Sequence, residues 1–270
     1  MTTAGKKKVQ PVTKPYLTGG VFDETTVKKA LGFFGMLLIF ALMAFLVSGM
    51  VVFGSRVFTI IFNTAVILIL LFIAYNRGAS FGTEAVARGE ILYQRKEKGG
   101  EMTENERKLS FHPAKGFVIG LLGTLPLLIL TAVFAIITRK QFSTIGVLPG
   151  FAANLAQRSE IGDALVTYTV PEPLGAADIL RPIVRGILMP VFRMADTENK
   201  GLMLTLERLS PLMILLPGIA HGFGYLTGRG ERTRVHTRIA ESRKMRKRRE
   251  NKERRERREN GSKRTPEKLN

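Results

Sequence analysis

His221 is the residue of this chain whose position first suggests chemistry, because it is the one ionisable side chain within the uncharged part of an apolar stretch. Keeping an ionisable group inside a membrane costs free energy, so such groups often handle protons or substrates. Asn63, in a second apolar stretch, completes a candidate intramembrane polar site. A neutral imidazole needs only one donor and one acceptor as partners. We therefore favour a structural hydrogen bond for His221 over proton or substrate handling.

The chain offers few other means of catalysis. It contains no cysteine and three histidines, which excludes disulfides, thiolate metal sites and cysteine nucleophiles. It has no phosphate-binding loop ending in Gly-Lys-Ser or Gly-Lys-Thr and no His-Glu-x-x-His zinc motif. Ser210 and His221 fall on one predicted helix about 16 Å apart, which is too far for a nucleophile and its base. We expect neither an enzyme nor a site for a metal or cofactor.

Four apolar stretches predict membrane-spanning helices. Residues 31–53, 57–75 and 117–138 contain no Asp, Glu, Lys or Arg, and about 20 apolar residues suffice to cross a hydrocarbon core of about 30 Å. The fourth stretch, 201–228, is interrupted by two prolines and His221. Because only three residues separate the first two stretches, we expect them to form a tight antiparallel hairpin. The predicted fold is an all-α integral membrane protein with four transmembrane helices.

These stretches divide the chain into seven segments. They are a basic N-terminal segment (1–29), a transmembrane hairpin (30–76), a loop (77–115), a third transmembrane helix (116–138), an external segment (139–200), a fourth transmembrane helix (201–228) and a basic tail (229–270). The first, third and last share one side of the membrane and contain six, eight and eighteen Lys and Arg. Since basic residues are retained on the cytoplasmic side, both termini are predicted to be cytoplasmic, in a bacterial cell membrane.

The external segment is too long for a structureless loop, so it should contain helices of its own. Residues 151–166 have a weak amphipathic pattern. A stronger stripe recurs at three- and four-residue spacing in Ile179, Leu180, Ile183, Val184, Ile187, Leu188, Val191 and Phe192, with Arg181, Arg185 and Arg193 off the stripe. We expect an interfacial helix whose apolar face covers the bundle and whose arginines face lipid phosphates. A re-entrant pair of helices is the alternative.

Two further patterns predict contacts between the transmembrane helices. Gly218 and Gly222 are four residues apart and could pack against Gly116 and Gly120 of the third span. The alternative is a broken helix that lines a cavity, as in many transporters. At the external interface, we expect an ion pair between Arg56 and Glu207.

The loop between the second and third spans has local helix signals. Thr103 followed by Glu106 is a capping-box pattern, which predicts a short helix over 104–110. Residues 83–98 are predicted to continue the second span as a helix beyond the membrane. We expect these elements to frame the bundle rather than to bind a ligand.

The tail concentrates the net charge of +19, with eighteen Lys and Arg against seven Glu in residues 229–270. Its densest run comprises Arg243, Lys244, Arg246, Lys247, Arg248 and Arg249. Such a helical, solvated arm could contact anionic lipid headgroups, ribosomal RNA or an acidic protein. The tail contains no Phe, Tyr or Trp, so base stacking is unavailable to it.

Together these features favour a non-enzymatic scaffold or assembly subunit of a membrane complex, with the lipid bilayer and other membrane proteins or a second copy as partners. One alternative is a transporter or channel component that uses His221 and a bent fourth span. Another is a ribosome- or RNA-tethering protein that acts through the tail. A wet cavity lined by His221 and Asn63 would favour transport, whereas dry packing would favour a scaffold.

Overall fold

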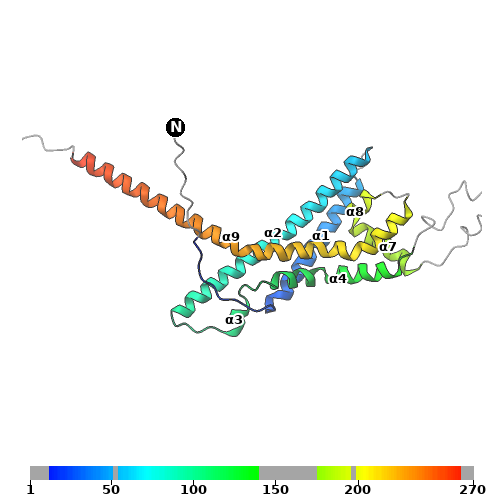
Figure 1. The fold of residues 1–270 in the computed structure, drawn as a ribbon, viewed down its shortest axis with the longest axis horizontal. Coiled ribbons are helices and arrows are strands. Elements are labelled where there is room, and N and C mark those ends of the chain that lie inside the picture. Colours follow the sequence, from blue (N-terminus) through cyan, green and yellow to red (C-terminus); the bar gives the residue numbers. More distant parts are fainter. Residues whose placement is uncertain (1–11, 51–53, 140–174, 196–198, 263–270) are drawn as a thin grey trace, which may run out of the picture.

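The computed structural model describes residues 12–50, 54–139, 175–195 and 199–262, which form helices and, within these ranges, no strand (Figure 1). The helices are α1 (Glu24–Met50), α2 (Arg56–Glu97), α3 (Glu104–Lys108), α4 (Lys115–Ile137), α7 (Ala176–Ile187), α8 (Met189–Met194) and α9 (Lys200–Ser262). Four of these, α1, α2, α4 and α9, are long and apolar enough to cross a membrane. The prediction of an all-helical protein with four such helices is confirmed. The helix expected over 151–166 lies outside the described residues.

Two of the spanning helices are much longer than a membrane is thick. α2 has 42 residues and α9 has 63, which correspond to roughly 63 Å and 95 Å at 1.5 Å per residue. We call residues 229–262 of α9 the arm, the end of the bundle from which they project the arm end, and the opposite end, which carries α7 and α8, the far end. The expected continuation of the second span as a helix over 83–98 is confirmed, since α2 ends at Glu97.

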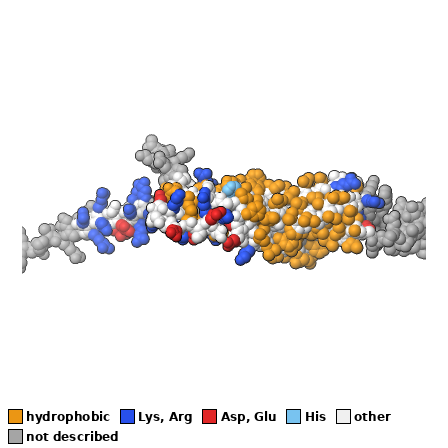
Figure 2. All heavy atoms as spheres, turned by 90° about the horizontal axis from the view of Figure 1, so that it is seen from below, with side chains coloured by type: hydrophobic (Ala, Val, Ile, Leu, Met, Phe, Trp, Pro, Cys, Tyr) orange, Lys and Arg blue, Asp and Glu red, His pale blue; other side chains and the backbone are white. Residues whose placement is uncertain are grey.

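A belt of exposed apolar side chains surrounds the bundle. Figure 2 shows hydrophobic side chains gathered over one continuous region, with Lys, Arg, Asp and Glu concentrated toward the arm. Ile39, Phe72, Ile136 and Leu212 come from four different helices, and each is more than 60 % exposed. Apolar patches of this extent are rare on soluble monomers, whereas lipid covers them favourably.

The spanning helices do not pair in the expected order. α9 packs along α2 and α4, while α1 packs mainly against α4. α8 contacts both α1 and α2, whose direct contact with each other is slight. The tight hairpin expected from the short connection therefore does not form, because α8 occupies the space between its two helices near the far end.

The apolar pattern that begins at Ile179 forms two helices rather than one, with Leu188 between α7 and α8. Val184, Leu188 and Phe192 are buried and join the core of the bundle. Ile179, however, is 58 % exposed, whereas Arg181 is only 6 % exposed. The expectation that the arginines would face lipid phosphates is thus wrong for Arg181, because a carboxylate inside the bundle attracts it.

The loop before α4 and the N-terminal residues close the arm end. α3 begins with a capping box, in which Thr103 Oγ1 accepts the N–H of Glu106 at 3.3 Å and Glu106 Oε2 accepts the N–H of Thr103 at 3.2 Å. This contact confirms the short helix expected in the loop. The N–H of Val12 donates to Thr237 Oγ1 at 3.1 Å. The described N-terminal residues and the arm therefore lie at the same end.

Candidate functional site

Helix α9 carries most of the candidate residues, spread along its length. It packs between α2 and α4, and its buried polar side chains are Glu207, Ser210, His221 and His236. These occur at increasing distance from the far end. Glu207, His221 and His236 each bind a neighbour on a different helix.

Glu207 lies near the far end and is 1 % exposed. Arg181 Nε donates to its Oε1 at 3.0 Å, Arg185 approaches the same oxygen at 2.6 Å, and Thr138 Oγ1 donates to Oε2 at 2.6 Å. The carboxylate therefore joins α7, α9 and the residue that follows α4. Glu207 makes these contacts in place of the expected ion pair with Arg56, which is the first residue of α2.

The charges around Glu207 are nearly balanced. Arg181 also donates to Asp178 Oδ1 at 3.1 Å and to the carbonyl oxygen of Arg139 at 2.9 Å. Two guanidinium groups therefore face two carboxylates. The side chain of Arg181 is 8 % exposed and that of Arg185 is 31 % exposed, so water reaches only the second one well. Every charge that this cluster buries has a partner, which is the arrangement of a structural clamp.

Glycines let α9 approach α4 closely. A Cβ at Gly120 would overlap the carbonyl oxygen of Gly218, so one glycine from each of the two expected pairs meets at this point. The other two glycines do not meet each other. Gly116 lies against the side chain of Tyr225, and Gly222 lies against an aromatic ring of α4. Small residues at a helix interface allow the backbones this proximity.

A second glycine contact joins α9 to α2, and the spacing of the glycines along the chain did not predict this pairing. A Cβ at Gly224 would overlap the carbonyl oxygen of Tyr75. Further toward the arm, the backbones of Gly82 and Gly228 are in contact. α9 is therefore held closely on two sides.

His221 is completely buried between these contacts. Its Nδ1 lies 3.0 Å from the carbonyl oxygen of Gly116, so Nδ1 donates the hydrogen bond. Its ring packs against Phe33 and Phe81, with centroids 4.8 Å and 5.8 Å away. Nε2 has no hydrogen-bond partner among the described residues. Among the described residues, these neighbours give the imidazole one hydrogen bond and an aromatic enclosure.

Asn63 is not part of the same site. It is 2 % exposed, and its Nδ2 donates to the carbonyl oxygen of Thr59 on its own helix at 2.8 Å. Gly78, which contacts the backbone of His221, is fifteen residues further along α2, a rise of roughly 22 Å. His221 and Asn63 therefore do not form the joint intramembrane polar site that the sequence analysis expected.

Residues 78–82 have the spacing Gly-x-Ser-x-Gly, which in hydrolases marks a nucleophile at a strand-to-helix turn. In this protein these residues lie inside α2, and Ser80 is exposed. A Cβ at Gly78 would overlap the carbonyl oxygen of His221, so this glycine allows α9 to approach closely. The spacing thus allows close helix packing.

No known protein family, curated protein or solved structure matches the chain. Its function is therefore inferred from the geometry described here.

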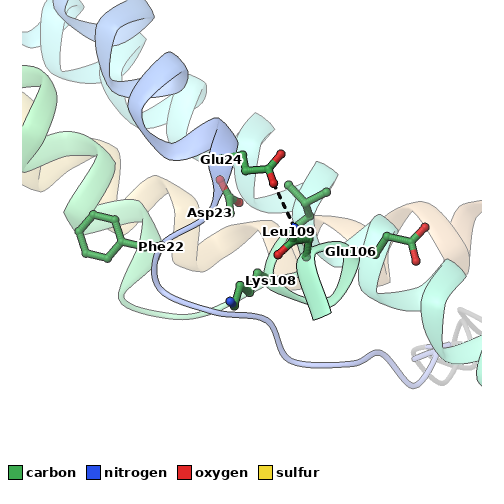
Figure 3. A pocket seen from close by; sticks show the side chains of 7 residues that line it. Phe22, Asp23, Glu24, Glu106, Lys108 and Leu109 are labelled. Atoms are coloured by element: carbon green, nitrogen blue, oxygen red, sulfur yellow. Dashed lines mark hydrogen bonds between the residues drawn. The ribbon is translucent and has the colours of Figure 1, made fainter. Parts of the chain in front are cut away.

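A surface pocket opens at the arm end between α3 and the residues before α1 (Figure 3). At its edge, Asn105 donates a hydrogen bond to Glu24 at 3.2 Å. Asp23 also lines the pocket, but its side chain is 3 % exposed and pairs with Lys115. Burial alone would raise the pKa of Asp23. The hydrogen bonds from Lys115 and two threonine hydroxyls, with the Lys115 charge, outweigh burial and lower this pKa to about 2. Asp23 thus fastens the chain to α4 and is not free to bind a ligand.

A buried ion pair braces the base of the arm against α2. Glu90 is 4 % exposed and accepts hydrogen bonds from His236 Nε2 at 2.8 Å and from Arg232 Nε at 3.0 Å. Gly228 and Gly230 lie just before these residues, and each glycine weakens a helix interior by about 1 kcal/mol relative to Ala. The brace therefore supports α9 where its own propensity is low. The four-residue spacing of Arg232 and His236 indicated a common face, but nothing in the sequence paired them with Glu90.

Beyond the brace, the arm continues as a helix to Ser262. Every side chain from 241 to 258 is exposed. The predicted basic residues all lie in this stretch: Arg243, Lys244, Arg246, Lys247, Arg248 and Arg249. At 100° per residue, Arg246 and Arg249 lie on a different face of the helix from the other four.

Proposed function

We propose that the protein is a non-enzymatic scaffold of a membrane complex, which holds a rigid basic helix on the cytoplasmic side of the membrane. The continuity of α9 carries this proposal, because one helix runs from the far end of the bundle to Ser262. Residues 229–262 extend roughly 50 Å along the helix axis. Such an arm can hold a partner at a fixed distance from the membrane.

The distribution of basic residues supports the proposed cytoplasmic position of the arm, and the membrane that we propose is a bacterial cell membrane. The arm, the described N-terminal residues and the loop before α4 share one end of the bundle and carry most of the Lys and Arg. At the far end, Arg181 and Arg185 are paired with carboxylates. Basic residues near the ends of spans favour the cytoplasmic side. Partners within the membrane, either another protein or a second copy, would bind to the apolar belt.

The contacts of α9 favour a scaffold over a transporter. Backbone contacts at Gly120 and Gly224 hold α9 closely against α4 and α2, and aromatic rings enclose His221. Asn63 lies too far along α2 to share a cavity with His221. Close packing of this kind suits a scaffold, whereas transport requires a water-filled passage.

A comparison of two variants tests the proposal in cells that lack the native gene. Truncation after Glu241 removes the exposed part of the arm and should abolish complementation and the assembled complex on a native gel. His221→Gln keeps a polar side chain of similar size and should preserve both. The opposite pattern, with a functional truncation and an inactive His221→Gln, would favour the transporter and overturn the scaffold. A truncation that leaves the complex and the complementation unchanged would also overturn it.

A further inference from the structure

Between residues 243 and 258, one face of the arm carries only cationic residues and a single asparagine, Asn251. At 100° per residue, this face covers about 140° of the helix circumference between residues 243 and 258. We call its seven cationic residues the stripe: Arg243, Lys244, Lys247, Arg248, Arg254, Arg255 and Arg258. All seven are exposed, and none makes an ion pair with another described residue.

The acidic residues between 241 and 258 lie on the other face. Glu241, Glu250, Glu253 and Glu256 fall within the remaining part of the circumference, among four cations. Glu250 pairs there with Arg246 at 2.9 Å, and Glu256 approaches Lys252 at 3.6 Å. One face of the arm is therefore nearly neutral, and its positive charge is concentrated on the stripe.

The stripe lies beyond the reach of the membrane on which the bundle sits. Arg229 is the first charged residue after the apolar part of α9, and the stripe begins roughly 20 Å and ends roughly 44 Å further along the axis. The screening length at physiological salt is about 8 Å. The arm continues away from the apolar belt (Figures 1 and 2), and the brace at Glu90 holds its base. Anionic headgroups of the same bilayer are therefore a poor match for the stripe.

The composition of the stripe identifies the class of partner. Five of its seven cations are Arg, whose planar guanidinium binds phosphate with two parallel hydrogen bonds. Its length of about 23 Å matches a duplex segment that carries roughly 13 phosphates on its two strands, at one per 1.7 Å. A protein interface would be expected to contain apolar or aromatic anchors, and the stripe has none.

We propose that the stripe binds the phosphate backbone of RNA or DNA without base specificity, at a distance from the membrane set by the arm. This inference rests on the proposed scaffold function, because it requires the arm to project as a rigid helix. Base recognition is not expected, since the arm carries no Phe, Tyr or Trp for stacking.

The test uses the full-length protein in nanodiscs of uncharged, zwitterionic lipid, titrated against fluorescent 24-base-pair duplexes of RNA and of DNA. The stripe variant carries Lys247, Arg254, Arg255 and Arg258 changed to Gln. The matched control carries Arg246, Arg249, Lys252 and Arg257 changed to Gln, which removes the same four charges from the other face. Circular dichroism verifies that both arms remain helical.

We expect the stripe variant to bind at least tenfold more weakly than the control at 150 mM salt. The slope of log affinity against log salt should fall by up to about 3.6 for four lost phosphate contacts. The relative affinities for the two duplexes distinguish RNA from DNA as the source of the phosphates. Equal weakening in both variants would overturn the inference, as would tighter binding to polyglutamate or to phosphatidylglycerol vesicles than to either duplex. If the unaltered protein forms the native complex but binds neither duplex, this inference alone is overturned and the scaffold stands.

Discussion

Replacement of Glu207 by Gln should destabilise the bundle more than any exposed charge replacement. The substitution keeps the size of the side chain but leaves Arg181, which is 8 % exposed, without its main counter-ion. Breaking a buried ion pair costs about 3 to 5 kcal/mol. Because Gln retains one acceptor oxygen and water reaches Arg185, we expect the lower end, about 3 kcal/mol, which lowers the folding equilibrium constant by more than 100-fold.

The assay is equilibrium unfolding in mixed micelles with increasing SDS, followed by far-ultraviolet circular dichroism. Glu250→Gln is the matched control, because Glu250 pairs with Arg246 on the surface at 2.9 Å, with side chains 49 % and 82 % exposed. An exposed pair of this kind contributes about 0.5 kcal/mol. Arg181→Gln in the Glu207→Gln background should recover part of the loss. The reasoning is refuted if Glu207→Gln costs no more than the control, or if the double variant is as unstable as the sum of the single ones.

Three further predictions concern other contacts of the bundle and the arm. Gly224→Ala places a Cβ against a backbone carbonyl and should lower the thermal unfolding midpoint in detergent. Gly49 faces open space, so Gly49→Ala should not lower this midpoint. Equal midpoints for the two variants would contradict the close approach of α9 to α2. Glu90→Gln should increase amide hydrogen exchange at the base of the arm and leave the apolar spans unchanged; unchanged exchange would show that the brace is dispensable. Asp23 has a folded pKa of about 2 and an ordinary value of 3.8, so its stabilising effect is complete above about pH 4 and is lost as the pH falls toward 2. This loss should be about 2 kcal/mol and absent in Asp23→Asn, and a wild-type unfolding free energy that stays constant from pH 5 to pH 2 would count against it.

Local properties of the sequence predicted the elements of this fold well. The spanning helices follow from uncharged length, because lipid forces the backbone of such stretches into helices. The capping box at Thr103 and Glu106 depends on residues only three apart, so its pattern was enough to predict α3. The continuation of α2 beyond the apolar stretch followed in the same way from local pattern.

Contacts between distant parts of the chain could not be predicted in this way. Lipid gives apolar helices no strong preference for a neighbour, so helix pairing depends on surface shape, such as the contact of Gly224 with Tyr75. The orientation of Arg181 depended on Glu207, 26 residues away. Arg185 lies four residues from Arg181, and this spacing indicated only that the two arginines share a face. It did not identify the carboxylate that they bind.

The central claim is that the arm is one rigid helix from the bundle outward. The natural chain has no cysteine, so Gly230→Cys with Arg255→Cys gives two unique attachment sites for spin labels, and the first faces open space. Twenty-five residues of helix separate the backbones of these sites by roughly 38 Å. Double electron–electron resonance spectroscopy on the protein in nanodiscs should give a narrow distance distribution centred close to this value. A broad distribution centred well below it would show a flexible or folded-back arm and contradict the account.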